Sequence, residues 1–461
     1  MITYIKINGF KSFHHFEMEF TPLTVIAGAN ASGKSNLFDA LKLLGRLAEE
    51  TDHLKKAFKE QRGEFIELFT QYGENEYATE IEFVVEMLVN RKVKDSWGNE
   101  AELKYTRLRY ELKIKRFTNS LGIEDLAVTY EHLENLKPKQ DKWVRLLPEE
   151  IVENWRPNVN KVRTIPYIKT ETENNRPTVL VSQEGLLGAN KRFPLNNATR
   201  TVLSSFDTVD FPHVLAAKEE MRRWKFLQLN PEDLRQPTHK NTGDDVISES
   251  GQNLAAVLHR IKQEELYTLR EISRDFQTFL PHFVDVDVID DTENNQYLLK
   301  LTDKDKKEYT SRVLSEGTLR ILALCILEYD SKHTGLLCFE EPENGIPPFR
   351  IETMAKLLKH LSVDFAELEM PLRQVIVNTH SPVLVGMMNR WEPDLNVNIW
   401  YAEMRDRVTD IHKKQRVKLS VTSILPVING KMPLMLSFSE PDKKLTLSKL
   451  KRYLETASNQ S

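Results

Sequence analysis

The chain has 461 residues, of which 40% are hydrophobic and 29% charged, and its formal net charge at pH 7 is -4. These values are ordinary for a globular protein with one large or two medium domains, and they exclude nucleic-acid binding through a global positive field. With two cysteines, no apolar window of about 18 residues and no signal-peptide core, we expect a cytoplasmic chain without disulfides or membrane spans.

The first predicted elements are a strand at residues 23–27 and a helix that begins near Lys34. Between them, residues 28–35 read GANASGKS and match the G-x-x-x-x-G-K-[ST] phosphate-binding loop. We expect Lys34 to reach the β- and γ-phosphates and the Ser35 hydroxyl to ligate Mg2+; the structural alternative is a glycine-rich turn with an incidental lysine. The ATP-binding residues predicted here are Gly28, Asn30, Gly33, Lys34, Ser35 and Asn36.

A long and irregular segment follows the first lobe. Gln71 precedes a strand at residues 78–86 and is a candidate metal contact, with an exposed loop glutamine as the alternative. Residues 103–115 and 125–132 alternate between apolar and polar side chains, which predicts strands. Residues 138–212 are rich in proline, asparagine and charge; one helical pattern lies inside this region at residues 148–155, and another follows it at residues 213–224. Sustained heptads are absent, so the segment is not a long coiled-coil arm.

The signature segment LSEGT lies at residues 314–318. It follows a predicted long helix at residues 251–280 and strands at residues 284–289 and 297–301. The small residues permit close approach of a phosphate, and the helix start supplies N–H donors. Ser315, Gly317 and Thr318 are the predicted phosphate contacts of this segment.

Two further apolar runs end in polar residues. Residues 336–339 predict a buried strand that delivers Glu340 and Glu341 at its C-terminal end, where parallel sheets bind ligands. By position, Glu340 would hold Mg2+ and Glu341 would orient or deprotonate the attacking water, although a strand ending in a solvated acidic turn would look similar. Residues 374–377 predict a strand that delivers His380 as a γ-phosphate contact or proton relay, with a structural histidine as the alternative. A helix and two short strands near residues 397–402 and 409–412 are expected to follow.

In this order, the phosphate loop, the signature, the acidic strand end and the histidine resemble the ABC-type ATPase heads of the RecF/SMC-like group. The opening MITYIKINGFKSF resembles the first strand and turn of those heads. Residues 224–226, 234–235 and 250–254 resemble the stand-alone AAA-family predicted ATPases, which are similar to OLD-type ATPases and to ATPase subunits of PARIS-, Septu- and retron-linked anti-phage systems. Two positions depart from the pattern: Glu340 replaces the usual Asp, and Pro347 replaces a His.

The resemblance implies an α/β fold, namely an ABC-type P-loop head with a mixed sheet, flanking helices and an inserted α+β domain. The expected division is an N-terminal lobe with the phosphate loop, an inserted domain, a C-terminal lobe with the signature, acids and histidine, and a C-terminal extension. These parts correspond to residues 1–90, 91–210, 211–405 and 406–461.

The resemblance also implies partners. Since the signature of this class caps ATP bound by a second head, we expect a homodimer or higher homo-oligomer that uses ATP and Mg2+. The expected role is a sensor or scaffold that controls a separately encoded nuclease or toxin in anti-phage defence. The alternatives are a RecF-like DNA-repair ATPase and a nucleotide-dependent switch with little turnover. DNA is a further candidate partner because of basic stretches at residues 107–116, 412–418 and 443–452, each of which also fits a solvated face.

Overall fold

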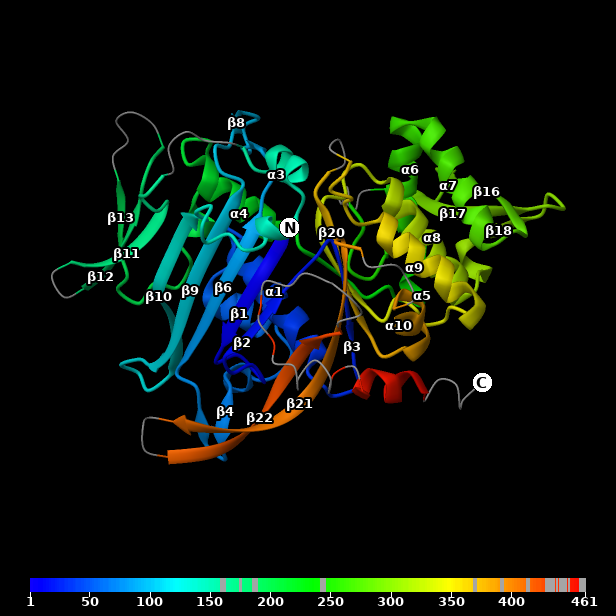
Figure 1. Ribbon diagram of the computed structural model, residues 1–461. Coiled ribbons are helices and arrows are strands. Elements are labelled where there is room, and N and C mark those ends of the chain that lie inside the picture. Colours follow the sequence, from blue (N-terminus) through cyan, green and yellow to red (C-terminus); the bar gives the residue numbers. More distant parts are fainter. Residues whose placement is uncertain are drawn as a thin grey trace.

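Three layers make up the computed structural model (Figure 1). A large antiparallel sheet lies on one side, a lobe rich in helices lies on the other, and a mostly parallel sheet runs between them. The mixed α/β fold class predicted from the sequence is therefore confirmed. The structure describes residues 1–157, 163–173, 176–184, 190–240, 246–367, 371–389, 394–411, 415–427, 436, 438, 446 and 448–455.

The outer sheet has eight antiparallel strands in the order β13-β12-β11-β10-β9-β6-β1-β2. Along β9, the side chains of Leu108, Tyr110, Leu112 and Ile114 are buried, as the alternating pattern predicts. They share one hydrophobic core with strands β1 and β6, so the strands of residues 91–210 extend the sheet of the first lobe. The strands are β1 (Ile2–Asn8), β2 (Phe16–Glu19), β6 (Glu80–Leu88), β9 (Arg107–Thr118), β10 (Glu124–Asn135), β11 (Ile168–Glu173), β12 (Arg176–Val181) and β13 (Lys191–Pro194).

The central sheet has six strands in the order β14-β19-β20-β3-β21-β22, and its first five strands are parallel neighbours. Successive residues of β3 face opposite layers: Ile26 packs in the core of the outer sheet, while Val25 and Ala27 pack against the helical lobe. Burial on both faces explains why these strands read as continuous apolar runs. The strands are β14 (Lys225–Leu227), β19 (Gly335–Glu340), β20 (Arg373–Thr379), β3 (Leu23–Ala27), β21 (Val397–Ile411) and β22 (Gln415–Pro426).

The helical lobe carries the signature segment at the start of α8. A small antiparallel sheet of β15, β17 and β16 supports it, with β18 paired to β17. The elements on this side are α5 (Pro231–Arg235), β15 (Thr238–His239), α6 (Leu254–Glu264), α7 (Leu266–Phe279), β16 (Phe283–Asp291), β17 (Gln296–Asp303), β18 (Glu308–Thr310), η4 (Ser311–Val313), α8 (Glu316–Tyr329), η5 (Pro348–Arg350), α9 (Ile351–His360) and α10 (Pro382–Met388).

The remaining elements surround the outer sheet and the phosphate loop. Helix α1 follows β3, and α4 packs beside α1. These elements are α1 (Lys34–Leu47), α2 (Leu54–Lys59), η1 (Phe65–Leu68), β4 (Gln71–Gly73), β5 (Glu76–Tyr77), β7 (Lys92–Lys94), β8 (Glu100–Glu102), η2 (Val144–Leu146), α3 (Glu149–Trp155), η3 (Leu203–Ser205) and α4 (Pro212–Arg222). Among the described residues, no helix has the length and apolarity needed to span a membrane.

Two predicted elements differ from the structure. The single helix expected at residues 251–280 is broken at Glu265, whose φ of −149° is extended, and the break lets α6 and α7 fold back on each other over β17 and β16. The two short strands expected near residues 397–402 and 409–412 belong to one strand, β21, which ends at Ile411, while residue 412 lies outside the described residues. Strand β22 pairs with β21 through the polar middle of β21. This ladder of hydrogen bonds keeps the backbone of β21 extended where its side chains give no apolar pattern.

Candidate functional site

The predicted phosphate loop lies between β3 and α1, the setting that the motif requires. Gly33 caps α1 with a φ of 85°, a left-handed conformation that favours glycine. A Cβ atom on Gly33 would collide with the side chain of Thr422, and one on Gly28 would collide with the carbonyl oxygen of Ala402. The hairpin of β21 and β22 therefore packs directly on the loop, and both glycines are needed for this close approach.

Lys34 is buried in the first turn of α1. Its Nζ donates hydrogen bonds to the carbonyl oxygens of Gly28 at 2.7 Å and Ala29 at 2.8 Å. Burial lowers the pKa of Lys34, and the acidic side chains that follow β19 oppose this shift by stabilising the charged form. The ammonium group is thus aimed into the loop.

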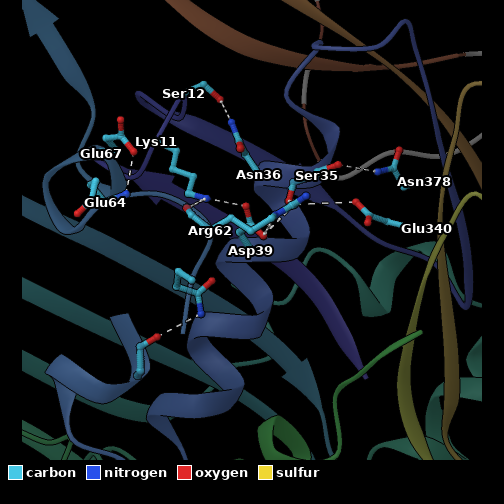
Figure 2. A network of polar contacts seen from close by, with 12 residues as sticks. Lys11, Ser12, Ser35, Asn36, Asp39, Arg62, Glu64, Glu67, Glu340 and Asn378 are labelled. Carbon is cyan, nitrogen blue, oxygen red and sulfur yellow. Dashed lines mark hydrogen bonds and ion pairs between the residues drawn. The ribbon is translucent and has the colours of Figure 1, made fainter. Parts of the chain in front are cut away.

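The register of the central strands brings two predicted metal-binding residues, Ser35 and Glu340, together with Asn378. Glu340 lies opposite Asn378 in the ladder, and Asn378 lies opposite Ile26 of β3. Nδ2 of Asn378 donates to Oγ of Ser35 at 3.4 Å, and Figure 2 shows both side chains near Glu340 at the start of α1. Hydroxyl, carboxylate and amide oxygens are ligands that Mg2+ prefers, and Oδ1 of Asn378 is buried without a hydrogen-bond partner. The donor set therefore fits Mg2+.

The two asparagines of the predicted ATP-binding set lie differently. Asn30 is exposed on the loop, next to Ala31, whose φ is 61°. Asn36 is turned toward the first-strand loop, where its Nδ2 donates to Oγ of Ser12 at 2.7 Å. That hydroxyl lies 2.6 Å from Oγ1 of Thr422. Asn36 thus links α1 to the hairpin that covers the phosphate loop.

Glu341 and His380 form a pair at the same sheet edge. Nδ1 of His380 lies 2.7 Å from Oε1 of Glu341, and Nδ2 of Asn344 donates to the other carboxylate oxygen at 2.8 Å. The side chains are 36% and 42% exposed, so water reaches both. Glu341 takes a φ of 50°, and its backbone N–H donates to the carbonyl oxygen of Asn378 at 2.8 Å. A carboxylate held in this way can orient a water molecule or accept its proton.

Glu343 is a neighbouring residue that the sequence pattern did not single out, because it reads as a loop acid after a proline. It is 7% exposed, accepts a short hydrogen bond from Oγ1 of Thr379, and has one buried oxygen without a hydrogen-bond partner. Burial raises the pKa of Glu343. The contact ties the turn that carries Glu341 to the loop that carries His380.

Arg62 was also missed, since no motif marks the segment after α2. Its Nη2 donates to the carbonyl oxygen of Ser35 at 3.3 Å and lies 4.0 Å from Oε1 of Glu340. Figure 2 shows Arg62 beside Asp39 and Lys11 on the face of α1 nearest the site. The structure therefore adds a second cation, besides Lys34, next to the predicted metal-binding residues.

The signature segment forms the N-terminus of α8. Oγ of Ser315 caps the helix by accepting from the N–H of Thr318 at 3.3 Å, and the two hydroxyl oxygens lie 2.8 Å apart. Gly317 packs so closely on the carbonyl oxygen of Gly345 that a side chain would not fit. Ser315 is exposed, and among the described contacts no hydrogen bond joins the signature to the phosphate loop.

Gln71 lies in the small hairpin of β4 and β5. Its side chain is exposed, and its Nε2 donates to the carbonyl oxygen of Glu74 at 3.3 Å within the same hairpin. None of the described contacts brings Gln71 to Ser35 or Glu340. Arg62 and Asn378 reach them instead.

Most cations of the first basic stretch are paired within the protein. Arg107 is buried in an ion pair with Asp141, and carboxylates of its own and neighbouring strands pair with Arg109, Lys113 and Arg116. Residues 412–414, 443–445 and 447, which belong to the other two stretches, lie outside the described residues. The first stretch therefore fits an internal salt-bridge network better than a DNA-binding face.

Comparison with solved structures gives distant likenesses to SMC head domains. An SmcHead bound to the C-winged helix domain of ScpA is 14% identical, with 93% of this chain and 98% of that chain covered and a TM-score of 0.49. The SMC head of Thermotoga maritima is 12% identical, with 93% of this chain and 99% of that chain covered and a TM-score of 0.37. The Smc head of Pyrococcus furiosus, bound to the C-terminal domain of ScpA, is 13% identical, with 99% of each chain covered and a TM-score of 0.43. At these TM-scores the likenesses carry no argument. No curated protein matches the sequence significantly.

A family model described as "AAA domain, putative AbiEii toxin, Type IV TA system" matches residues 23–386. The match covers well over half of the chain and includes the phosphate loop, the signature, both acidic residues of the strand end and His380. The resemblance to an ATPase head that the four motifs carry, and the resemblance to the stand-alone AAA family that residues 224–254 carry, are thereby confirmed, and the chain belongs to this family of AAA domains.

Proposed function

We propose that this chain binds and hydrolyses ATP. The observation that carries the proposal is the parallel register of β19, β20 and β3, which gathers Ser35, Glu340 and the Glu341–His380 pair at one sheet edge beside Lys34. Phosphoryl transfer needs positioning and charge neutralisation more than covalent chemistry from the protein. This group of side chains supplies both.

Each residue of the site has a distinct task in the proposed reaction. Lys34 exchanges its two carbonyl partners in the loop for phosphate oxygens. Glu341 accepts the proton of the attacking water, while His380 and Asn344 hold its carboxylate in place. Ser35 and Glu340 would hold Mg2+, which neutralises phosphate charge when it is bound.

We further propose that two chains assemble head to tail, as a homodimer or within a larger homo-oligomer. The exposed N-terminus of α8 has N–H groups that suit a phosphate, and Ser315 makes no described hydrogen bond to the phosphate loop of its own chain. A second copy would bring its own ATP under Ser315 and Gly317. ATP then joins the two chains, and its hydrolysis releases them.

The biological role that we propose is a sensor or scaffold that controls a separately encoded nuclease or toxin in anti-phage defence. The description of the matching family names a putative toxin of a type IV toxin–antitoxin system, which supports a role in a system of paired proteins. A RecF-like repair ATPase and a switch with little turnover are the competing outcomes of the experiments below.

Nucleotide binding and phosphate release test the first part of the proposal. The purified chain should release phosphate from ATP, and Lys34→Ala should weaken ATP binding by at least about 100-fold because the buried ammonium contact is lost. Lys55→Ala is the matched control, since Lys55 lies on the neighbouring helix α2 and pairs with Asp125 at the surface. Normal ATP affinity of Lys34→Ala would contradict the phosphate-loop assignment; tight ATP binding without turnover would favour a switch.

Affinity purification of the tagged chain tests the role. The chain would be expressed together with its neighbouring genes, with ATP and with ADP, and the bound proteins identified by mass spectrometry. A nuclease or toxin retained only with ATP supports effector control. Replication or recombination proteins would instead support the RecF-like alternative.

A further inference from the structure

We infer that Asp39 is a positioning residue that holds two cations, Lys11 and Arg62, beside the phosphate loop. The inference rests on the proposed ATPase function and deepens it. Cations near the loop would recognise the terminal phosphate, and the carboxylate of Asp39 would position them without contacting the nucleotide itself. Asp39 lies on α1, and its side chain is 9% exposed.

The contacts of Asp39 come from two separate segments of the chain. Nζ of Lys11 donates to Oδ2 at 2.7 Å, while Nε and Nη2 of Arg62 donate to Oδ1 at 3.0 and 2.9 Å. Lys11 also donates to the carbonyl oxygen of Arg62 at 2.9 Å. One buried carboxylate thus joins the first-strand loop, the segment after α2 and the helix of the phosphate loop (Figure 2).

Lys11 is held in an unusual conformation at this point. Its φ of 45° is left-handed, which costs free energy for a residue with a side chain. The next residue, Ser12, accepts from Asn36, and Asn36 and Asp39 are three residues apart on α1, so they share one face of the helix. Two neighbouring polar contacts therefore fix the loop on α1, and the strained backbone directs the Lys11 ammonium to Asp39.

Arg62 extends beyond Asp39 toward the metal-binding residues. Its side chain is 60% exposed, its Nη2 donates to the carbonyl oxygen of Ser35 at 3.3 Å, and the same nitrogen lies 4.0 Å from Oε1 of Glu340. A cavity of about 250 Å³, lined by Asp39, Arg62 and Glu340 among other residues, gives the guanidinium group room to move. A guanidinium group placed here can bind phosphate oxygens through two parallel hydrogen bonds.

Charge explains why a carboxylate is needed. Lys11, Lys34 and Arg62 would repel one another at the start of α1, and Asp39 offsets this repulsion for two of them. Arg62 lies beside Glu340, a proposed Mg2+ ligand. Its positive charge should therefore strengthen the binding of ATP, which has the terminal phosphate, more than the binding of ADP. Loss of Asp39 should therefore reduce the preference for ATP over ADP.

Binding of fluorescent ATP and ADP analogues to Asp39→Asn and Arg62→Gln tests the inference. Each variant should weaken ATP binding about tenfold and change ADP binding by less than about threefold, as expected for one charge-assisted contact. The double variant should bind ATP no more weakly than Asp39→Asn alone, because the loss of Asp39 already releases Arg62. Asp39→Glu, which keeps the charge, should recover most of the preference for ATP.

Asp52→Asn is the matched control. Asp52 is a buried carboxylate that pairs with Lys56 and Arg46 away from the site, so its variant should lose stability but keep the preference for ATP. Equal losses of ATP and ADP affinity in Asp39→Asn, or additive losses in the double variant, would overturn the positioning role. If Lys34→Ala still abolishes binding in that case, the ATPase proposal survives; if Lys34→Ala binds normally, the ATPase proposal itself fails.

Discussion

Strained single residues gather around the candidate site. Lys11, Ala31 and Glu341 have φ values of 45°, 61° and 50°, although each carries a side chain. Such conformations cost free energy and persist only where surrounding contacts enforce them. For Glu341 the contacts are the N–H bond to Asn378 and the side-chain bonds to Asn344 and His380. The backbone therefore holds the proposed base in place before any nucleotide binds.

Replacement of Glu341 by Gln tests its task as a base. Gln keeps the size of the side chain and its hydrogen bond with Asn344 but cannot accept a proton, so kcat should fall by about 10²–10⁴ while ATP affinity stays close to that of the wild type. Phosphate release and nucleotide binding would be measured on the same preparation. Glu352→Gln, on the exposed surface of α9, is the control. Turnover of Glu341→Gln at the native rate would remove Glu341 from the mechanism.

At the scale of elements, α8 presents its N-terminus outward from its own chain. Ser315 is exposed, whereas Gly317 packs on the turn that follows Glu341. A change in dimer contacts at Ser315 would therefore be transmitted to Gly345, four residues after the proposed base. The element that binds the partner in the proposed dimer thus touches the element that carries the chemistry.

Ser315→Arg should block assembly without blocking nucleotide binding. The long charged side chain would occupy the space that the proposed partner's ATP needs, while the phosphate loop of the same chain remains unchanged. Light scattering with and without ATP, together with ATP affinity, measures both properties. Ser120→Arg, in the exposed turn between β9 and β10, is the matched control. An ATP-dependent increase in mass that persists in Ser315→Arg would argue against a signature-mediated dimer.

The contact between strand β10 and the start of η3 should make the free energy of unfolding depend on pH. Glu131 on β10 is fully buried and accepts from the N–H groups of Val202 and Leu203, which lie at the start of η3. Burial raises the pKa of Glu131 from 4.5 to about 7, against these hydrogen bonds. Between these two values the folded chain holds the proton that the unfolded chain has lost.

The free energy of unfolding should therefore decrease as pH rises from about 4.5 to 7, by up to about 3 kcal/mol from this group, and become level above that range. In Glu131→Gln this part of the decrease should disappear. Urea unfolding at several pH values gives the slope, which is the readout, because Gln also alters the hydrogen bonds. An unchanged slope would show that Glu131 does not titrate in this window.

At the scale of the whole molecule, one buried arginine joins the middle of the chain to its beginning. Arg107 on β9 is 1% exposed; it pairs with Asp141 at 3.0 and 3.1 Å and donates to Oγ1 of Thr3 on β1 at 2.9 Å. Its guanidinium group also lies 4.7 Å from the ring centre of Trp143, which packs on Phe365. The segment of residues 91–210 is thus bound to the outer sheet and to the loop before β20.

Arg107→Ala should reduce the free energy of unfolding by about 3–5 kcal/mol, because it leaves the carboxylate of Asp141 buried and unpaired. Urea unfolding measures the loss, and Arg107→Met combined with Asp141→Leu should recover much of it. Lys115→Ala, at an exposed position of the same strand, should change stability by no more than about 0.5 kcal/mol. A loss as small as that of Lys115→Ala would show that the two parts do not depend on this link.

Local patterns in the sequence were sufficient for the fold class and for naming most residues of the candidate site. The glycines and Lys34, the acids after β19 and His380 each belong to a short segment whose chemistry and strand or helix setting can be read together. The same reasoning could not place Gln71, which has no contact with Ser35 or Glu340 among the described residues. It also predicted one helix where Glu265 separates α6 from α7.

The sequence by itself determined which residues are the candidates for the proposed phosphate chemistry, because that chemistry requires particular side chains at a fixed local spacing. Only the tertiary structure decided which distant segments meet around them. Arg62, Asp39 and Glu343 have no motif, and they reach the site through ion pairs, hydrogen bonds and strand register between segments far apart in the chain. Contacts of this kind depend on the packing of whole layers, which no local pattern of residues encodes.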